Sequence, residues 1–377
     1  MDFRIADEDA AAFEAISAFA EKELRPRARE IDEASLFATV HIPRLAEVGL
    51  MGMNLPERWG GAGVSPVALF LAVQAMAAAC ASTASLVTAH FLATDTILLG
   101  GDDALKARYL PDAAAGKKLG AFALTEPRAG SNPADMATRA ERDGDVYHLI
   151  GTKHFISNAA AADFIIVFAL TDRSMGARGI SAFVVERATS GIEVGPAEKT
   201  MGLRGGHIFE IMLDCRVPAA NRVGAEGEGF RTAMRVLDNG RIEVSAMCCG
   251  IASAAFEAAL AWSKQREVGG APIAELQGIQ WMLADMATDL DAARLLGLRA
   301  ATLRERGARF SAEASMAKLY GSEMAARVTD LALQIHGGYG YSRSLPLERY
   351  VRDARIMRIY EGSSEIQRNI IARSILR

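Results

Sequence analysis

The sequence lacks a strong net charge, and this absence narrows the classes of partner it can have. Its 377 residues carry a formal net charge of −4 at pH 7. A chain of this kind has no general electrostatic affinity for nucleic acid or anionic membranes. No basic run with interleaved aromatic residues occurs either. We therefore expect no nucleic-acid partner and no membrane partner.

Cysteine is scarce, and its spacing argues against a metal site. Neither Cys80 nor Cys215 has a second cysteine at C-x-x-C spacing, and Cys248 and Cys249 are adjacent in an alanine-rich stretch. Such spacing suits neither zinc nor a disulfide framework. We expect no metal and four buried free thiols in a reducing compartment. The first residues are acidic and contain no apolar signal core, so we expect no leader and a cytoplasmic location.

Charged residues are absent from one long stretch, which raises the question of a membrane span. No Asp, Glu, Lys or Arg lies between Arg58 and Asp95, but polar residues interrupt the stretch, and Ser82 to Ser85 look like a helix break with caps. A membrane-spanning helix needs roughly 20 predominantly apolar residues in a row. The stretch therefore predicts two buried helices. No Lys or Arg follows Arg58 before Lys106, so an apolar ligand group among these helices is favoured over an anionic one.

The periodicity of apolar residues divides the chain into three parts, which we predict as domains 1–118, 119–230 and 231–377. The first part is helical and alanine-rich, and Pro26 is expected to kink or end its first helix. The second consists of short β-rich runs without helices between them, which predicts an antiparallel sheet or small barrel. The third contains long amphipathic helices typical of a four-helix bundle, with faces broad enough to pack on other subunits. The predicted fold class is α+β.

One carboxylate near the end of the chain, Glu361, is the candidate around which the other segments are interpreted. Ser364 and Gln367 have the spacing of a capping box that opens the last helix. Glu361 and Gly362 then lie in the irregular turn before that helix, where a carboxylate can point into a cleft and the glycine leaves room for a ligand. Taken alone, the spacing is more typical of a solvated acid near a helix N-terminus.

Three further segments carry polar or aromatic groups suited to a ligand. Residues 123–132 end a strand and become a loop of small and hydroxyl residues, although a polar β-turn explains that loop equally well. In residues 153–158, Phe155 offers an aromatic face and Ser157 a hydroxyl, with a half-buried strand as the alternative. Residues 334–341 end a long helix with glycines, as a plain helix C-cap also would.

Taken together, these segments resemble those of the acyl-CoA dehydrogenases, a family of flavoproteins, and the resemblance covers essentially the whole chain. Residues 125–131 (TEPRAGS) are similar to the first signature of the family. Residues 353–355 (DAR) and 359–362 (IYEG) are similar to the second. Residues 201–205, 217–218 and 224–230 match family strings between the two signatures. Several such strings in the right order indicate the family more strongly than any one of them.

The resemblance implies roles for individual residues around FAD and an acyl-CoA thioester. Glu361 would be the catalytic base. Cofactor contacts would come from Phe122, Leu124, Thr125, Gly130, Ser131, Phe155, Ser157, Ser363 and Glu365, and, toward the FAD of a neighbouring subunit, from Arg266, Gln277, Gln334, Gly337 and Gly338. Substrate contacts would come from Ser131, Leu237, Asp238, Arg241, Tyr360 and Gly362. Asp238 and Arg241 could equally form an ordinary surface ion pair.

The reaction that the resemblance implies is α,β-dehydrogenation of an acyl-CoA to the trans-2-enoyl-CoA. Glu361 would remove the α-proton, the β-hydrogen would pass as hydride to flavin N5, and an electron-transfer flavoprotein would accept the electrons. Some relatives carry the base just before the helix arginine instead of in the C-terminal turn. This chain has Gly240 before the arginine, and glycine cannot act as a base, so Glu361 is the one candidate base at these two positions. The family also implies a homo-oligomer, with a tetramer built as a dimer of dimers expected.

Other activities remain open on the same scaffold: enoyl-thioester reduction, oxidase chemistry, or dehydrogenation of a carrier-protein thioester. A non-catalytic thioester-binding protein is a fourth possibility, against which the presence of Glu361 argues. The chain also departs from family patterns. Residues 266–270 (REVGG) lack the aromatic residue of R-x-x-F-G, Asn132 stands where an acid is common, and Phe155 where tryptophan is common.

Overall fold

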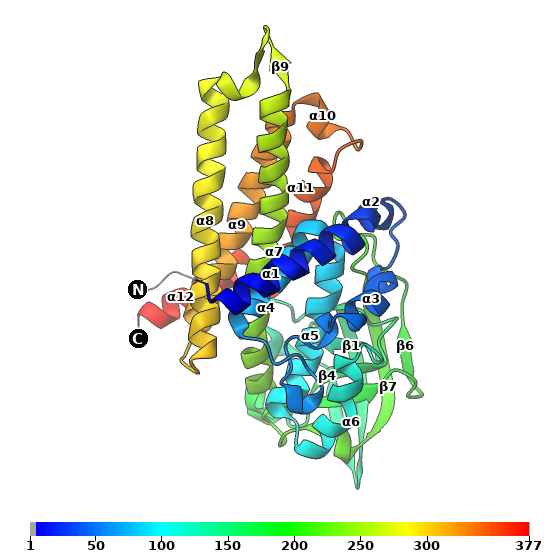
Figure 1. The fold of residues 1–377 in the computed structure, drawn as a ribbon. Coiled ribbons are helices and arrows are strands. Elements are labelled where there is room, and N and C mark those ends of the chain that lie inside the picture. Colours follow the sequence, from blue (N-terminus) through cyan, green and yellow to red (C-terminus); the bar gives the residue numbers. More distant parts are fainter. Residues whose placement is uncertain (1–4, 377) are drawn as a thin grey trace.

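A computed structural model describes residues 5–376 and shows helices at both ends of the chain around a central sheet (Figure 1). The first helical part comprises α1 (Asp7–Phe19), α2 (Arg25–Glu33), α3 (Ile42–Glu47), α4 (Pro66–Ala79), α5 (Ala81–Gly100) and α6 (Asp103–Ala114). Pro26 does not end the first helix. Helix α2 continues directly from α1 through a π-helical turn over Ala20–Leu24. A π turn is a usual way to absorb the bend that a proline imposes.

The uncharged stretch forms two buried helices, as predicted. Helices α4 and α5 are separated at Cys80, which has extended backbone angles (φ −151°, ψ 99°). The predicted position of the break was wrong, since Ser82 to Ser85 lie inside α5. Ser65 caps α4 by accepting a hydrogen bond from the Ala68 amide. Helix α5 is buried between β1 and α7, whereas α4 is buried among α1, α5, α7 and α8.

The central part of the chain forms an eight-stranded sheet. Its strands are β1 (Gly120–Ala123), β2 (Arg139–Asp143), β3 (Val146–Ser157), β4 (Phe164–Leu170), β5 (Ile180–Glu186), β6 (Ile192–Val194), β7 (Ile208–Pro218) and β8 (Arg222–Val223). The order is β6-β7-β3-β2-β4-β5-β8, with β1 beside β4. Most pairs are antiparallel, as predicted, whereas β1 and β2 each pair with β4 in parallel. Every residue of β4 is buried, which explains its continuous apolar sequence.

The C-terminal part consists of three long helices and shorter elements packed on them. The long helices are α7 (Gly229–Gln265), α8 (Gln277–Glu305) and α9 (Ser311–His336), which run side by side (Figure 1). A small hairpin, β9 (Glu267–Val268) and β10 (Ala271–Pro272), joins α7 to α8 at the tip of the bundle. Helices α10 (Gly338–Tyr341), α11 (Leu347–Ile356) and α12 (Ser364–Ile375) follow, and all three contact α9.

Helix α7 is the central element of the molecule. It is long and apolar enough to cross a membrane, but 72% of its most apolar window is buried by the rest of the chain. Helix α7 packs against α4, α5, α8 and α9, so the two helical parts share one core. All four cysteines are buried and free, as predicted. The predicted domain boundaries remain a proposal. They fall between α6 and β1 and at the beginning of α7.

Candidate active site

Glu361 lies in the turn between α11 and α12, as the sequence predicts. Its backbone is in the left-handed region (φ 52°), as is that of Gly362 (φ 91°). A left-handed conformation is unfavourable for a residue with a side chain, costing about 1–2 kcal/mol. Two hydrogen bonds hold the turn in place, because the side-chain amide Nε2 of Gln367 donates to the carbonyl oxygens of both Glu361 (3.1 Å) and Gly362 (2.9 Å).

The predicted capping box at the beginning of α12 was wrong in its details. The N-cap residue is Ser363, and Ser364 instead donates its hydroxyl hydrogen to Glu323 (2.7 Å) on α9. Gln367 does reach back from α12, but it donates to carbonyl oxygens of the turn. The residues that resemble a cap therefore fix the Glu361 turn against α9.

The Glu361 side chain points at helix α7, where Gly240 leaves room for it. A Cβ atom on Gly240 would overlap the Oε2 atom of Glu361 and would lie 2.9 Å from Leu92 of α5. Oε2 of Glu361 is buried and has no hydrogen-bond partner among residues 5–376. A buried oxygen without a partner is costly unless a ligand or water completes the site. Burial raises the pKa of Glu361 to about 7, although the charges of Lys318 and Arg241 oppose the rise.

The backbone of this turn offers further unpaired groups. Within the described part of the chain, the amides of Glu361, Gly362 and Ser363 donate to no carbonyl or side-chain acceptor, whereas Tyr360 and Ser364 donate to carbonyls of the preceding helix and turn. A free amide hydrogen beside a free carboxylate oxygen is a combination that can bind a carbonyl and act on the adjacent carbon. Such preorganised donors stabilise a developing oxyanion.

The acid and arginine predicted near the thioester form a largely buried ion pair on α7. Arg241 donates to Asp238 at 2.5 Å, and Ser311 of α9 donates to the same carboxylate at 2.9 Å. The pair is not the surface pair that its spacing alone favours, since the Arg241 side chain is only 6% exposed. Nε of Arg241 is buried without a partner in residues 5–376. Leu237, one turn from Arg241, packs on the same buried cluster as Phe122 of β1.

The segments predicted to hold a flat ring come together where the loop after β1 meets the end of β3. The amide of His154 donates to the carbonyl of Thr125 at 2.9 Å, so the loop after β1 lies against the far end of β3. The buried Lys153 ammonium donates to the Leu124 carbonyl (3.1 Å) and to Glu126 (2.8 Å). These bonds hold Leu124 and Thr125 against Lys153 and His154, which directly precede Phe155.

Phe155 is placed by a β-bulge. The pairing of β3 with β7 shifts register between Lys153 and Ile156, and Phe155 has φ 57°. The bulge directs the ring outward, and Phe155 is 56% exposed although it lies within a strand. An exposed aromatic ring on a strained backbone suits the stacking of a planar ligand.

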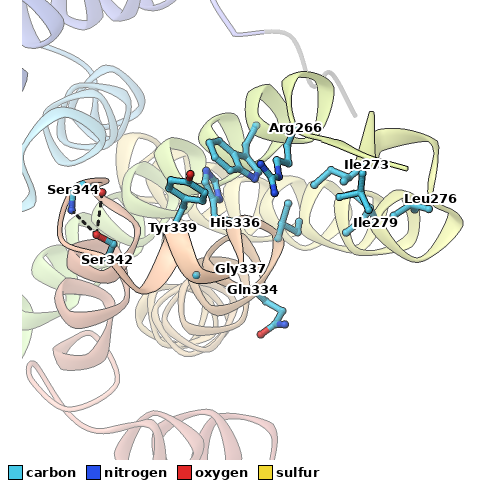
Figure 2. A pocket seen from close by; sticks show the side chains of 14 residues that line it. Arg266, Ile273, Leu276, Ile279, Gln334, His336, Gly337, Tyr339, Ser342 and Ser344 are labelled. Carbon is cyan, nitrogen blue, oxygen red and sulfur yellow. Dashed lines mark hydrogen bonds between the residues drawn. The ribbon is translucent and has the colours of Figure 1, made fainter. Parts of the chain in front are cut away.

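A cleft of about 640 Å³ lies at the ends of α7 and α9, beside the hairpin (Figure 2). Its lining includes four residues predicted to reach the FAD of a neighbouring subunit: Arg266, Gln334, Gly337 and Gly338. Trp262 stacks on His336 with ring centroids 5.0 Å apart and also meets Tyr339 at 5.2 Å. Gln277 is not in this lining, but Leu276 and Ile279 on either side of it are.

Some predicted residues remain apart from both groups. Gly130 and Ser131 lie in the exposed loop after β1, and no atom lies within 4 Å of a Cβ placed on Gly130. Ser363 and Glu365 lie at the beginning of α12, and within residues 5–376 no hydrogen bond joins them to the sheet. Tyr360 is closer to the base, and its hydroxyl donates to the sulfur atoms of Met357 (3.1 Å) and Met247 (3.6 Å).

Two buried charged residues were missed by sequence reasoning. Lys318 of α9 donates to the carbonyl of Gly362 at 2.7 Å. Glu243 of α7 is 2% exposed, and neither of its carboxylate oxygens has a partner in the described residues. Burial and the nearby Asp95 carboxylate raise the pKa of Glu243 well above its usual value. The one sequence signal for the burial of Lys318 and Glu243 is that each is a single charged residue on an otherwise apolar face of its helix.

Comparison with known proteins places these features in one family. The sequence models of the acyl-CoA dehydrogenase N-terminal, middle and C-terminal domains match residues 6–117, 121–215 and 227–376. The chain belongs to the acyl-CoA dehydrogenase family. It is therefore a flavoprotein oxidoreductase whose cofactor is FAD, as predicted.

Three similar proteins are informative about activity. The acryloyl-CoA reductase (NADH) of Anaerotignum propionicum is 44% identical over 100% of this chain and 96% of its own. Butyryl-CoA dehydrogenase from Megasphaera elsdenii has a TM-score of 0.98 at 40% identity, with both chains covered fully. A chain in the structure of the electron transferring flavoprotein of Acidaminococcus fermentans has a TM-score of 0.98 at 41% identity, again over 100% of both chains.

Proposed function

We propose that this protein dehydrogenates a short-chain acyl-CoA to the trans-2-enoyl-CoA, with Glu361 as the base. The observation that carries the proposal is the Oε2 atom of Glu361, which is buried and unpartnered in the space left by Gly240. A carboxyl with a pKa of about 7 matches the operating pH of a general base.

The turn supplies the groups that removal of an α-proton needs. The carboxylate of Glu361 accepts the proton from the carbon next to the thioester carbonyl. The free amide of the same residue donates a hydrogen bond to the thioester oxygen as negative charge develops there. Because both groups belong to one residue in a fixed backbone conformation, the distance between base and oxyanion donor is set before the substrate binds.

The residues where the loop after β1 meets the end of β3 fit a flavin ring. Phe155 offers an exposed face, Thr125 and Ser157 offer hydroxyls, and the Lys153 bonds hold the loop and strand together. The cleft near Trp262 and His336 suits the more distant part of an FAD bound by a neighbouring subunit. When bound, FAD supplies the acceptor for the β-hydride. The folded chain supplies the surface that would hold the ring, and it buries the carboxylate oxygen of the base.

A short acyl group is favoured by the packing beside Glu361. The hydroxyls of Thr88 (3.7 Å) and Tyr360 (3.6 Å) both approach the sulfur of Met247, so α5, α7 and the turn meet there and limit the depth of the site. The similarity to butyryl-CoA dehydrogenase supports the same substrate class. No Lys or Arg from α4 or α5 faces this region, which disfavours a second carboxylate on the substrate.

The reverse reaction is a second candidate, because one relative with 44% identity is an acryloyl-CoA reductase (NADH). The same base and donor groups serve both directions, with Glu361 returning a proton to the α-carbon. An electron-transferring flavoprotein is the proposed electron partner in either direction, supported by the similarity to a chain in such a structure. A homotetramer and a cytoplasmic location remain predictions.

The test is to mix purified holoprotein anaerobically with butyryl-CoA, octanoyl-CoA and palmitoyl-CoA and to follow the flavin absorbance. We expect the fastest bleaching with butyryl-CoA, with formation of crotonyl-CoA. Absence of bleaching by every acyl-CoA would contradict the proposal. Reduction of acryloyl-CoA by NADH in the presence of an electron-transferring flavoprotein, without bleaching by butyryl-CoA, would favour the second candidate.

A further inference from the structure

Lys318 is a buried charge that the proposed chemistry does not yet use. It lies on α9 with 0% exposure, and burial lowers the pKa of its ammonium to about 8. Among residues 5–376 the structure records one acceptor for its Nζ atom, the carbonyl oxygen of Gly362 at 2.7 Å. A buried ammonium with a single carbonyl partner is expensive, so a function is needed to account for it.

The carbonyl that Lys318 holds belongs to the turn that carries Glu361. That turn has two successive left-handed residues, Glu361 and Gly362, and three hydrogen bonds from side chains end on its carbonyls. Two of them come from Gln367 of the following helix. The third comes from α9, a different element, so Lys318 ties the turn to the core of the bundle.

The electrostatic surroundings of Lys318 are defined by two elements besides its own. Helix α7 contributes Cys248 and Arg241, α9 contributes Glu323, and the turn contributes Glu361. Of these, Arg241 is paired with Asp238, and Glu323 is hydrogen bonded by Ser364 at 2.7 Å. Glu361 has no such partner for Oε2 in the described residues.

We propose that Lys318 is a positioning residue for the base: it fixes the Glu361 turn through the Gly362 carbonyl and stabilises the ionised carboxylate with its buried charge. The inference rests on the proposed role of Glu361 and extends it. Without this charge, a carboxylate in apolar surroundings would hold its proton at neutral pH. With it, the base is kept ionised in a substantial fraction of the molecules while remaining basic enough to accept a proton.

The first test compares Lys318→Met with Lys318→Arg in FAD-loaded protein over a range of pH. For Lys318→Met we expect the acid limb of the bleaching rate to move to higher pH by about one unit, with a rate about fivefold lower at pH 7. Lys318→Arg keeps the charge and should leave the acid limb within about half a unit of wild type. An unmoved limb in a Lys318→Met protein that binds FAD would overturn the proposal.

A second measurement does not require any Lys318 variant to fold. Coupling between two titrating groups is reciprocal, so Glu361→Gln must change the titration of Lys318. Nitrogen-15 NMR of the lysine side chains in protein without substrate should show the Lys318 pKa falling by about one unit in Glu361→Gln. An unchanged Lys318 titration would overturn the proposal. Because this measurement uses no acyl-CoA, its outcome is independent of whether the proposed reaction is correct.

Discussion

The two halves of the candidate active site differ in how completely the chain alone forms them. The half that carries Glu361 is internal: the carboxylate faces Gly240 and Leu92, and the turn is fixed by Gln367 and Lys318. The half on the sheet is open, and its aromatic ring, Phe155, is 56% exposed.

Helix α5 lies between these halves and contacts both. Leu92 lies next to the Gly240 position, while Nδ1 of His90 accepts a hydrogen bond from the Gly120 amide of β1 at 2.9 Å. The Leu86 carbonyl accepts from Asn158, which follows β3 (2.9 Å). The difference between the halves shows that folding alone fixes the position of the base. The flavin surface is left exposed by folding and becomes covered only when FAD binds.

The largest effect that would test this comparison is expected from Gly240→Ala. The new methyl group overlaps Oε2 of Glu361 and must displace the carboxylate. A displacement of about 1 Å can cost about 100-fold in rate, so bleaching by butyryl-CoA should fall by about that factor while FAD stays bound. Gly278→Ala on α8 is the control for adding a methyl group to a helix glycine, since no atom lies within 4 Å of the new group. Equal rates in Gly240→Ala and wild type would show that the base half is not preorganised.

A smaller effect is expected from Phe155→Ala in the open half. Loss of one stacked ring should weaken FAD binding by about tenfold, because aromatic pairs contribute about 0.5–1.5 kcal/mol beyond burial of their area. The free energy of unfolding of the apoprotein should change by less than about 0.5 kcal/mol, since the ring is exposed. Met212→Ala on the neighbouring strand, 44% exposed, is the matched control. Flavin fluorescence during titration measures the affinity, and an unchanged affinity would remove Phe155 from the cofactor surface.

A third effect, on stability and not on activity, concerns Glu243, the buried acid near the base half. Its raised pKa means that the folded protein holds a proton that the unfolded chain releases, so stability falls as pH rises from about 4.3 toward the folded pKa. Glu243→Gln removes this titration. It should leave stability near pH 4 almost unchanged and increase the free energy of unfolding by about 1–3 kcal/mol at pH 8. Exposed Glu257→Gln on the same helix should have no comparable effect at either pH. A destabilised Glu243→Gln at pH 8 would indicate a charged, functional Glu243.

The sequence predicted the order of the helical and strand-rich parts because their apolar periodicities differ clearly. It also placed Glu361 in a turn and Phe155 beside Ser157. It missed α11, which is short, and β2, whose residues Arg139 to Asp143 are mostly charged because that strand is largely exposed. The strand that was the alternative for residues 153–158 is present, since β3 continues to Ser157.

The parts of the site that sequence could not give are contacts between distant elements. Nothing in the spacing of Lys318 indicates that its ammonium meets the Gly362 carbonyl, because the two residues lie on different elements. The buried state of the Asp238–Arg241 pair was equally hidden, since an acid and an arginine three residues apart also occur on exposed helix faces. Gly240 was noted only as a residue that cannot be a base. The structure shows that its missing side chain makes the space for the Glu361 carboxylate.

The most direct measurement of the central claim is stopped-flow bleaching of the Glu361→Gln variant by butyryl-CoA without oxygen. The amide keeps the size of the side chain but cannot accept the α-proton. We therefore predict full FAD content and bleaching slowed by at least about 1,000-fold, which is within the range of rate factors that a general base usually contributes. A variant that binds FAD and is bleached at the wild-type rate would contradict the assignment of Glu361 as the base.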